Sequence, residues 1–449
     1  MHATASVISF CLIAFSFLWI YALRPNTTPA LHHTISRLTS LPNWVWWLVA
    51  AFAFMLPVVE YWITAISHPN ALAGLLPWAD ATEYFFCSQG FLLNLPGPDH
   101  CGKRPFYLAF FSDILWLTGN RMQPALLLQA VIVGLACCVL VRELRRDLPG
   151  QCAIAAFAVC FLYVAAFGAG LVMTENVGVM LGVLAIAVLW RVGNEPNIGL
   201  FVLGMMLMAA AVTVRPGPLF VLPALLGWYF FYGREKWRGR AMGLCLLVGA
   251  IALGFSLSAV PSMVAGKSLG TTHSNFSYSL YGLVVGGKGW KQVTIDHPEI
   301  FSAGLSAKEQ TDRVYAAALD SLKSKPHLLV VGYAKGVLVY FDDLFRYAKE
   351  FKPLHVPLRF ICLLLPWALG LWYAIRNWRD PRFAMLLWLQ AGIIASSPFI
   401  AIDGYNRVFA STTGLDAVFV ALGILVLTNY FTKPATEQVA AMHSVSSAA

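Results

Sequence analysis

Charged residues are scarce in this chain. Asp, Glu, Lys and Arg make up 12% of the 449 residues, hydrophobic residues make up 59%, and the mean hydropathy is +0.68. An ordinary soluble domain carries roughly 25% charged residues, so this composition excludes that class. It predicts an integral membrane protein.

The short signatures of several enzyme classes are absent as well. The sequence contains no HExxH metal motif, no Walker phosphate loop and no dinucleotide-binding fingerprint. His100 and His273 lack metal-ligand spacing and are interpreted as loop residues. The net charge of +9 comes from Lys and Arg dispersed between apolar runs, so no nucleic-acid partner is expected.

Apolar runs long enough to cross a ~30 Å hydrocarbon core recur along most of the chain. The runs are continuous rather than alternating, and each must satisfy its own backbone groups in lipid, so we expect helices. The sequence predicts an all-α integral membrane protein with a bundle of about 11 transmembrane helices. Their expected ranges are 5–23, 44–66, 124–141, 151–169, 176–191, 197–213, 217–232, 241–260, 359–375, 383–402 and 411–430.

The distribution of Lys and Arg predicts the orientation of these helices. With the N-terminus outside, connections on the cytoplasmic side carry 14 Lys and Arg residues and the short outer loops carry 5. The first run has no Lys or Arg before it and no small-residue cleavage site after it, so we expect it to stay attached.

The chain divides into a main membrane domain with a short addition at each end. Residues 1–43 are expected to form an extra helix and a cytoplasmic loop, residues 44–430 the main domain, and residues 431–449 a disordered cytoplasmic tail. Within the main domain, the outer loop 67–123 and the outer segment 261–358 hold most of the polar chemistry. The loop is expected to carry the active site, and the segment to cover it.

The outer loop 67–123 is expected to contain two helices that lie at the membrane interface. Residues 79–93 and 104–117 are amphipathic and too short for confident spans. Cys87 and Cys101 lie in the same loop. On an oxidising outer face they would form a disulfide that closes a short loop, and the alternative is two free thiols.

The outer segment 261–358 has two halves. Residues 266–300 are rich in Gly, Ser, Thr and aromatics and are expected to form a long loop. Ser306 and Glu309 form a capping-box pattern that opens a helix through residue 321. Residues 327–345 are apolar but contain three charged side chains, so we expect an interfacial helix rather than a span.

An acidic cluster follows the run at 44–66. Asp80 and Glu83 are three residues apart, which places them on one face of a helix beside Tyr84. Ionisable groups next to a bilayer are costly to place and are therefore candidates for function. The alternatives are that Asp80 only caps the helix and that Glu83 belongs to a solvated helix face.

Further polar side chains stand at short outer connections. They are Lys103, Arg104, Glu175, Arg215 and Arg407. The expected topology brings all of them to the same side as Asp80. Carboxylates that face guanidinium groups suit proton transfer from an acceptor hydroxyl, while the Arg groups hold a phosphate leaving group.

These residues also have structural interpretations. Glu175 could be neutralised by Arg215 or Arg104 without taking part in catalysis. Arg215 and Arg407 could be anchors that snorkel at the ends of spans.

The order of these motifs resembles the GT-C superfamily of integral membrane glycosyltransferases, in particular the bacterial branch related to protein O-mannosyltransferases and aminoarabinose transferases. The resemblance covers roughly residues 44–430. It rests on a span followed by Asp80 with Glu83-Tyr84, then Lys103-Arg104-Pro105-Phe106-Tyr107, Glu175 at a short outer turn, Val214-Arg215-Pro216-Gly217 and a late outer Arg.

The resemblance implies a transferase of a bacterial inner membrane whose site faces the periplasm or exterior. The donor would be a sugar on polyprenyl phosphate, and the acceptor a surface glycan, a glycolipid or a protein. Asp80 maps onto the family's catalytic acid, Glu175 onto its second-loop acid and Arg215 onto a basic residue at the head of a later span. Many members carry a second acid directly after the first, whereas this chain has Ala81 there.

We therefore expect an inverting glycosyltransferase with Asp80 as general base and Glu83 nearby. Glu175 would orient the acceptor or help Asp80 to bind a divalent cation. The expected substrate-binding residues are Tyr84, Lys103, Arg104, Arg215 and Arg407. Two other classes stay open: a transporter or flippase of lipid-linked sugars, which would place its charges near mid-membrane, and a polymerase or ligase of surface polysaccharide.

Overall fold

The computed structural model describes residues 42–65, 67–93, 95, 101, 104–233, 236–264, 275–301, 304–351 and 355–432, and this part of the chain is almost entirely helical. Eight helical stretches in it are long and apolar enough to cross a membrane. They are α3 (Asn43–Thr64), α6 (Met122–Leu144), α7 (Gly150–Phe167), α8 (Thr174–Asn194), α11 (Trp237–Val264), the continuous stretch of α16, η4 and α17 (His355–Arg376), α18 (Pro381–Gly404), and η5 (Tyr405–Thr412) with α19 (Thr413–Thr432). The chain is an α-helical, multi-pass membrane protein.

The expected count of 11 spans is not confirmed. The runs expected at 197–213 and 217–232 are the shorter apolar helices α9 (Ile198–Val214) and α10 (Val221–Tyr232). Between them lie Pro216 and Pro218, which lack the backbone N–H that a continuing helix requires. The run expected at 5–23 lies outside the described residues.

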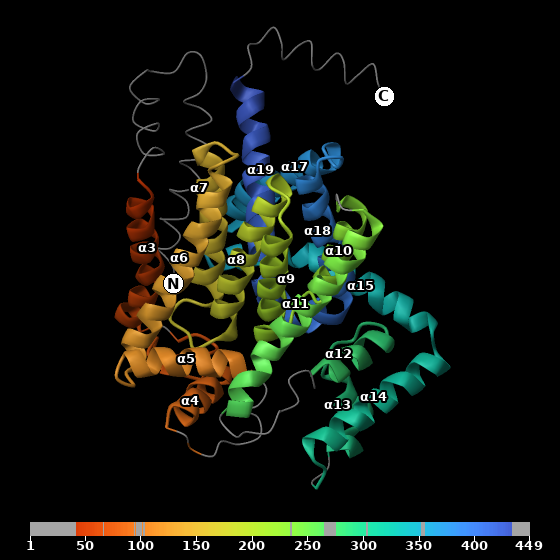
Figure 1. Cartoon of the computed structure of the whole chain (residues 1–449). Coiled ribbons are helices and arrows are strands. Elements are labelled where there is room, and N and C mark those ends of the chain that lie inside the picture. Colours follow the sequence, from red (N-terminus) through yellow and green to blue (C-terminus); the bar gives the residue numbers. More distant parts are fainter. Residues whose placement is uncertain are drawn as a thin grey trace.

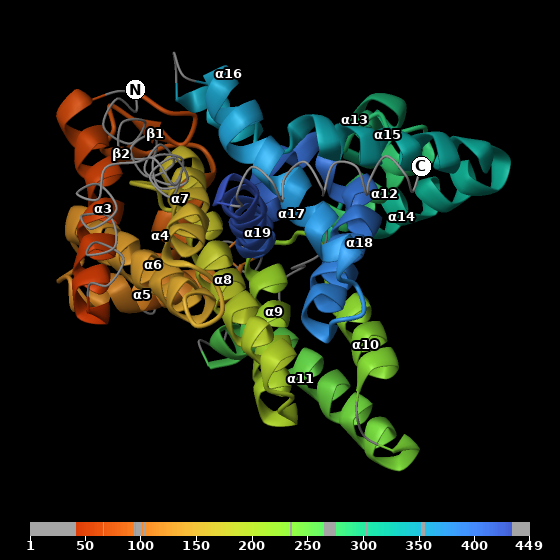
Figure 2. The same ribbon diagram turned by 90° about the horizontal axis from the view of Figure 1, so that it is seen from above.

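The centre of the bundle is formed by α7, α8 and α19. Nearly all of α7 is buried, and α19 packs against α7 and α17. Figure 2 shows α19 between these two helices. The peripheral helices α3 and α11 instead expose large apolar side chains, among them Phe52 and Leu253, as is expected of helices that face lipid.

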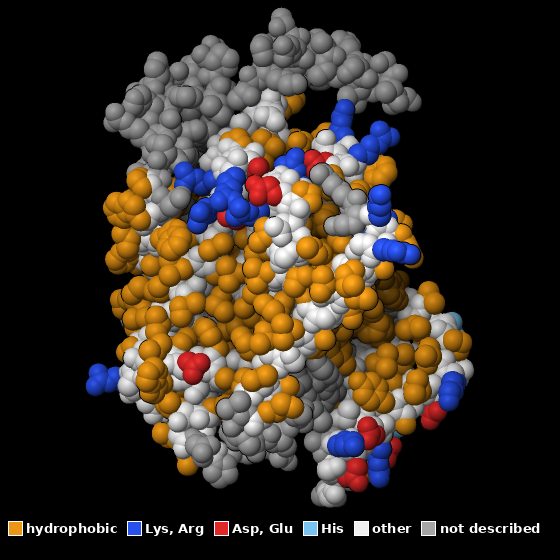
Figure 3. All heavy atoms as spheres, in the orientation of Figure 1, with side chains coloured by type: hydrophobic (Ala, Val, Ile, Leu, Met, Phe, Trp, Pro, Cys, Tyr) orange, Lys and Arg blue, Asp and Glu red, His pale blue; other side chains and the backbone are white. Residues whose placement is uncertain are grey.

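An apolar band separates two polar ends. Figure 3 shows hydrophobic side chains over the middle of one face, with charged side chains above and below them. At the end where α8 finishes, Arg382 pairs with Asp380 and donates a hydrogen bond to Asn194, and Trp190 donates to Asp147. Such a layering suits a protein that lies across a bilayer.

Two short helices lie at the other end of the bundle. They are α4 (Asp80–Leu92) and α5 (Pro105–Leu117), which confirm the helices expected at 79–93 and 104–117. Figure 1 shows α5 lying crosswise below the long helices. A disulfide joins Cys87 on α4 to Cys101, with their Cα atoms 5.4 Å apart. This bond holds the start of α5 close to α4.

A lobe with its own small core follows α11. It contains α12 (Asn275–Val284), α13 (Gln292–Asp296), η2 (Pro298–Phe301) and α14 (Ala307–Ser324). The long loop expected at 266–300 is therefore wrong from residue 275 onward. The cause is a set of apolar side chains that meet in this core, namely Tyr281, Val284, Val293, Ile300, Val314 and Ala318. The expected capping box of Ser306 and Glu309 is present.

The helix α15 (His327–Asp343) confirms the helix expected at 327–345 and packs along α18. Gly336 permits the contact, because a Cβ there would lie 2.4 Å from the Cα of Pro398. The placement of α15 at the membrane interface stays a prediction. The segment η3 (Arg346–Glu350) follows and packs against α7.

A glycine turn between α12 and α13 also contacts the bundle. A Cβ added to Gly287 would lie 3.1 Å from the Cδ1 of Ile402, near the end of α18, and 3.1 Å from the Cα of Gly332 on α15. The backbone of Gly287 has a φ of 69°, which glycine adopts without strain. The lobe is thus attached to the bundle next to the chain that leads into η5.

Candidate functional site

Glu175 lies in the first turn of α8, at the same end of the bundle as α4 and α5. The turn that precedes it is fixed by Asn176, whose Nδ2 donates to the carbonyl oxygens of Gly168 at 2.9 Å and Leu171 at 3.1 Å. The side-chain Nε2 of Gln129 on α6 also donates to Leu171, at 3.1 Å. Glu175 therefore stands on a braced turn.

Two glycines on α8 bring the late arginine segment η5 against this helix. A Cβ at Gly178 would lie 3.3 Å from the Cβ of Ala410, and a Cβ at Gly182 would lie 2.1 Å from the carbonyl oxygen of Ser411, both in η5. Gly178 also permits the approach of Arg215 at the end of α9, whose Cβ would lie 3.0 Å away. Small residues four apart on a membrane helix allow this close approach of backbones. Gly217 contributes in the same way, since a Cβ there would lie 2.3 Å from the carbonyl oxygen of Val408.

This packing creates a buried ion cluster. The Glu175 side chain is 1% exposed, and its Oε1 accepts a 2.7 Å hydrogen bond from Nε of Arg407. A terminal nitrogen of Arg215 lies 3.5 Å from the same oxygen, and the Thr174 hydroxyl donates to Oε2 at 3.2 Å. A buried carboxylate is tolerated only with such compensation. Of the two partners expected for Glu175, Arg215 forms the ion pair, and Arg407 joins it.

The backbone of Arg407 is held as firmly as its side chain. The Tyr163 hydroxyl of α7 donates to its carbonyl oxygen at 3.1 Å, and Nε of Arg215 donates to the same oxygen at 3.4 Å. Segments that are far apart in the sequence thus hold Arg407, through its backbone carbonyl as well as its guanidinium group. An anchor at the end of a span would not require this bracing.

Asp80 stands at the exposed side of the cluster. Its side chain is 60% exposed, and its Oδ2 lies 3.7 Å from a terminal nitrogen of Arg407. It begins α4 directly after Ala79, whose φ of 49° is unusual for a residue with a Cβ. Strained backbone of this kind is concentrated at functional sites. Arg407 is therefore shared by one buried and one exposed carboxylate.

Tyr84 and Arg104 complete the described part of the site. Arg104 precedes α5, is 9% exposed, and forms a side-chain hydrogen bond with Tyr84. Burial lowers the pKa of the Arg104 guanidinium, and the nearby Tyr84 and Glu175 oppose this effect. Burial raises the pKa of the Tyr84 hydroxyl, and Arg104 and Arg215 oppose that shift. Tyr84 also packs edge-on against the ring of Tyr107, at 5.5 Å.

One expected site residue among those described does not join this network. Glu83 is exposed in the first turn of α4. Lys103 lies outside the described residues, so its expected role stays a prediction. Among the described residues, Arg407 and Arg215 contact the carboxylates of Glu175 and Asp80, and Arg104 lies within the electrostatic influence of Glu175, so positive charge exceeds negative by one. The cluster can therefore accept an anion.

The arrangement bears on the expected divalent cation. Arg407 contacts both Asp80 and Glu175, the two carboxylates that would serve as its ligands. Within the part of the chain that the structure describes, no three His, Cys, Asp or Glu side chains gather as a metal site. In this arrangement the guanidinium fills the position between the acids.

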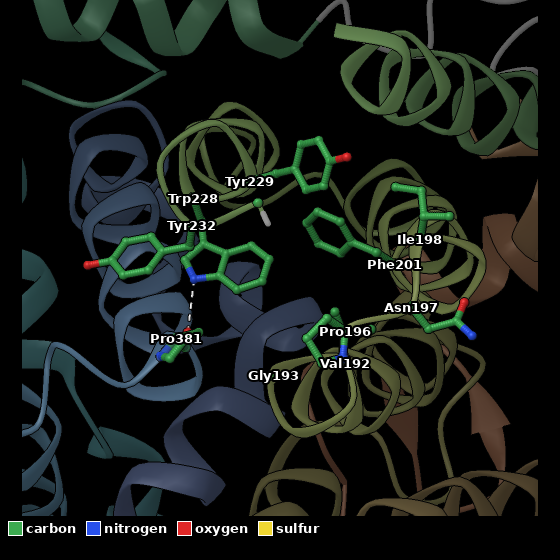
Figure 4. A pocket seen from close by; sticks show the side chains of 11 residues that line it. Val192, Gly193, Pro196, Asn197, Ile198, Phe201, Trp228, Tyr229, Tyr232 and Pro381 are labelled. Atoms are coloured by element: carbon green, nitrogen blue, oxygen red, sulfur yellow. Dashed lines mark hydrogen bonds between the residues drawn. The ribbon is translucent and has the colours of Figure 1, made fainter. Parts of the chain in front are cut away.

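A small pocket, unlike the cluster, lies where α8 ends and α9 begins. It is lined mainly by aromatic and apolar side chains, among them Phe201, Trp228, Tyr229 and Tyr232 (Figure 4). Its volume is about 40 Å³. The Trp228 indole donates to the carbonyl oxygen of Pro381 at 2.9 Å. Among the described residues that line it, none carries a charge.

These features define a class: an α-helical membrane protein with an ion cluster of paired carboxylates and guanidinium groups at one end of its bundle. Comparison of the sequence with family models and with curated proteins gives no match. The function is therefore inferred from the residues themselves.

Sequence reasoning missed residues that support or surround the cluster. The pattern Gly178-x-x-x-Gly182 is visible in the sequence and signals close helix contact. Tyr163 stands inside an apolar run and carries no comparable signal. His68 was also missed, although it shortly precedes the acidic cluster. Its pKa is lowered by burial and by the charge of Arg407, with Glu175 opposing.

Proposed function

We propose that the protein is an inverting membrane glycosyltransferase. It would move a sugar from a polyprenyl-phosphate-linked donor to an acceptor on the outer face of a bacterial inner membrane. The acceptor would be a surface glycan, a glycolipid or a protein. One observation carries the proposal: the exposed carboxylate of Asp80 shares Arg407 with the buried carboxylate of Glu175. An accessible base thus adjoins an anion-binding group at the end of an apolar bundle.

The reaction assigns a role to each partner. The acceptor hydroxyl attacks the anomeric carbon and forms a new C–O bond, while its proton passes to Asp80. The bond between the anomeric carbon and the phosphate oxygen breaks, and both of its electrons leave with polyprenyl phosphate. Positioned general bases contribute about 10²- to 10⁴-fold to such rates.

The guanidinium groups would neutralise the leaving phosphate. Arg407 and Arg215 are partly exposed at 28% and 14%, so each can contact Glu175 and still present N–H donors to a ligand. Arginine suits this task because its planar group binds phosphate oxygens in pairs. Arg104 and Tyr84 would line the same anion site, and Lys103 would approach it from the preceding segment.

Glu175 would act through the arginines. Oε1 accepts from Arg407 and lies near Arg215, and Oε2 accepts from Thr174. We therefore assign it the positioning of two phosphate-binding groups instead of contact with the acceptor. A divalent cation at Asp80 and Glu175 would have to displace Arg407, so the proposed steps use none.

The direct test replaces Asp80 by an isosteric amide. Asp80→Asn in membranes supplied with a labelled polyprenyl-phosphate sugar should lower transfer at least 100-fold, the lower end of the range for general bases. The protein should still fold and bind polyprenyl phosphate. Glu83→Gln is the matched control, because Glu83 is an exposed acid on the same helix, and it should retain most activity. Full activity of Asp80→Asn would remove the general base from the proposal.

A second candidate function rests on Asp416. This carboxylate lies in the spanning helix α19 and accepts a 3.0 Å hydrogen bond from the Trp367 indole. It also lines a cavity of about 10 Å³ with Tyr163 and Tyr347. Ionisable groups inside spans are typical of transport pathways, so a transporter or flippase of lipid-linked sugars is the alternative.

The two functions predict opposite variant patterns. A flippase reconstituted in vesicles should move a labelled lipid-linked sugar between leaflets, and Asp416→Asn should stop this movement while Asp80→Asn leaves it intact. A glycosyltransferase should depend on Asp80 and show no sugar movement without an acceptor.

A further inference from the structure

His68 belongs to a small hairpin that leads directly to Asp80. His68 and Ala71 form a backbone bridge, and the strands β1 (Ala71–Leu72) and β2 (Leu76–Pro77) pair antiparallel. The backbone N–H of Trp78 then donates to Asn70 at 3.0 Å. Asp80 follows two residues later. The hairpin therefore fixes His68 close to the residue that starts α4.

The ring of His68 is held in one orientation. The backbone N–H of Asn70 donates to its Nδ1 at 3.1 Å. The ring also packs edge-on against Tyr61 of α3, with centroids 6.3 Å apart at an angle of 84°. Because Nδ1 accepts a hydrogen bond, the neutral ring carries its proton on Nε2. Nε2–H is thus a donor on the ring edge away from the Asn70 N–H.

Two charged groups of the cluster act on His68: Arg407 from η5 and Glu175 from α8. Tyr61 is the titratable group that faces it from α3. Burial is the largest cause of the lowered His68 pKa, and Arg407 adds to it. His68 is neutral at neutral pH, and its side chain is only partly buried. It therefore offers an uncharged hydrogen-bond donor within the electrostatic influence of Arg407, without adding a further positive charge.

We infer that His68 is a further ligand-binding residue, which donates its Nε2–H to a phosphate oxygen held by Arg407 and Arg215. This inference rests on the proposed function, because it assumes that the cluster binds a phosphate group. The donor differs from the arginines in being uncharged, fixed by packing and carried by the hairpin of Asp80. It would hold the phosphate in a fixed position relative to Asp80, the proposed general base.

The test compares a variant that loses the donor with one that keeps it. His68→Phe retains the ring but removes Nε2–H, whereas His68→Gln places an amide N–H near the same position. The probe is polyprenyl phosphate, the product without its sugar, bound to the full-length protein in detergent. His68→Phe should weaken its binding about tenfold, as expected for one hydrogen bond to a charged group. His68→Gln should recover much of the loss. His68→Asn, whose shorter side chain can still accept from the Asn70 N–H but does not reach the Nε2 position, should bind as weakly as His68→Phe. Equal recovery in both variants would show a structural role and overturn the inference.

Inorganic phosphate distinguishes the two sources of the group. If it competes with the lipid in the wild type and loses that ability in His68→Phe, the contact is to phosphate itself. If His68→Phe weakens binding of polyprenyl phosphate but leaves competition by inorganic phosphate unchanged, His68 contacts the phosphate only when it is attached to the lipid. Equal lipid binding by wild type and His68→Phe would overturn the inference while the Asp80 result still supports transfer. If wild type binds neither polyprenyl phosphate nor its sugar conjugate, the proposed function itself fails.

Discussion

Nε of Arg407 donates a 2.7 Å hydrogen bond to Oε1 of Glu175, although 232 residues separate them in the chain. The pair is buried on the Glu175 side and open on the Arg407 side, where Asp80 lies. The guanidinium is therefore both a structural partner and an accessible anion-binding group.

Loss of Arg407 should destabilise the protein. Arg407→Ala leaves Glu175 buried with only the longer contact to Arg215, and breaking a buried pair costs about 3–5 kcal/mol. We expect the free energy of unfolding in detergent to fall by about 3 kcal/mol, at the lower end because Arg215 stays. Adding Glu175→Gln should restore part of the loss. Additive effects of the two changes would contradict the pairing.

Gly182 should tolerate no side chain. In Gly182→Ala the new Cβ would overlap the carbonyl oxygen of Ser411, and overpacking of this kind costs about 1–3 kcal/mol. Since Ser411 belongs to η5, the change should also impair transfer. The control is Gly249→Ala on α11, where a Cβ would meet nothing within 4 Å. That variant should keep wild-type stability and activity.

Replacing Ala79 by glycine should stabilise the protein. The φ of 49° at Ala79 is costly for a residue with a Cβ, so Ala79→Gly should raise stability by about 0.5–1 kcal/mol despite the greater freedom of the unfolded chain. Ala81→Gly, two residues on and within α4, should instead lower it by about 1 kcal/mol. Thermal unfolding of the two variants compares them directly, and a loss in both would disprove strain at Ala79.

The disulfide should contribute to stability as a unit. Cys87 and Cys101 are 14 residues apart, and closing a loop of this size is worth about 3 kcal/mol. Cys87→Ser, Cys101→Ser and the double variant should therefore be equally destabilised. In wild type neither Cys87 nor Cys101 should react with a maleimide, whereas both should react after reduction. Labelling at Cys87 before reduction would argue for the two free thiols instead.

Acid should weaken the fold through His68. Its pKa in the folded protein lies below the ordinary value of about 6.5, so the unfolded chain binds a proton more readily in that interval. Stability should be unaffected by this group above about pH 6.5 and should fall as the pH drops toward the folded pKa. Below that value the loss is complete. Unfolding curves of His68→Phe should lack this part of the pH dependence, and identical curves would refute it.

The sequence predicts those features that depend on local patterns and misses those that depend on tertiary contacts. Long apolar runs and the Ser306–Glu309 capping box are local, so most helices are where expected. The helices at 275–301 were missed because their stability comes from contacts with Val314 and Ala318, which no short pattern contains. The count of 11 spans is not confirmed, because α9 and α10 are shorter apolar helices, and length alone separates such a helix from a span.

The site shows the same division. Membrane sidedness predicted that Asp80, Glu175, Arg215 and Arg407 would emerge on one side, and the described residues place these four together. The ion-pair partners of Glu175 were harder to predict from the sequence. Whether Glu175 meets Arg104 or Arg407 depends on how closely η5 approaches α8, and thus on Gly182. The burial of Glu175 and the exposure of Asp80 likewise follow from tertiary packing.

The contact of Gly287 with Ile402 joins the lobe of α12 to α14 to the part of the bundle that leads to the ion cluster. Ile402 lies five residues before Arg407, near the end of α18, and the glycine turn packs directly on it. The turn meets the end of the Ile402 side chain in close contact, so a shift of the lobe toward the bundle would press on that side chain. The lobe thus touches the bundle just before the segment that carries Arg407.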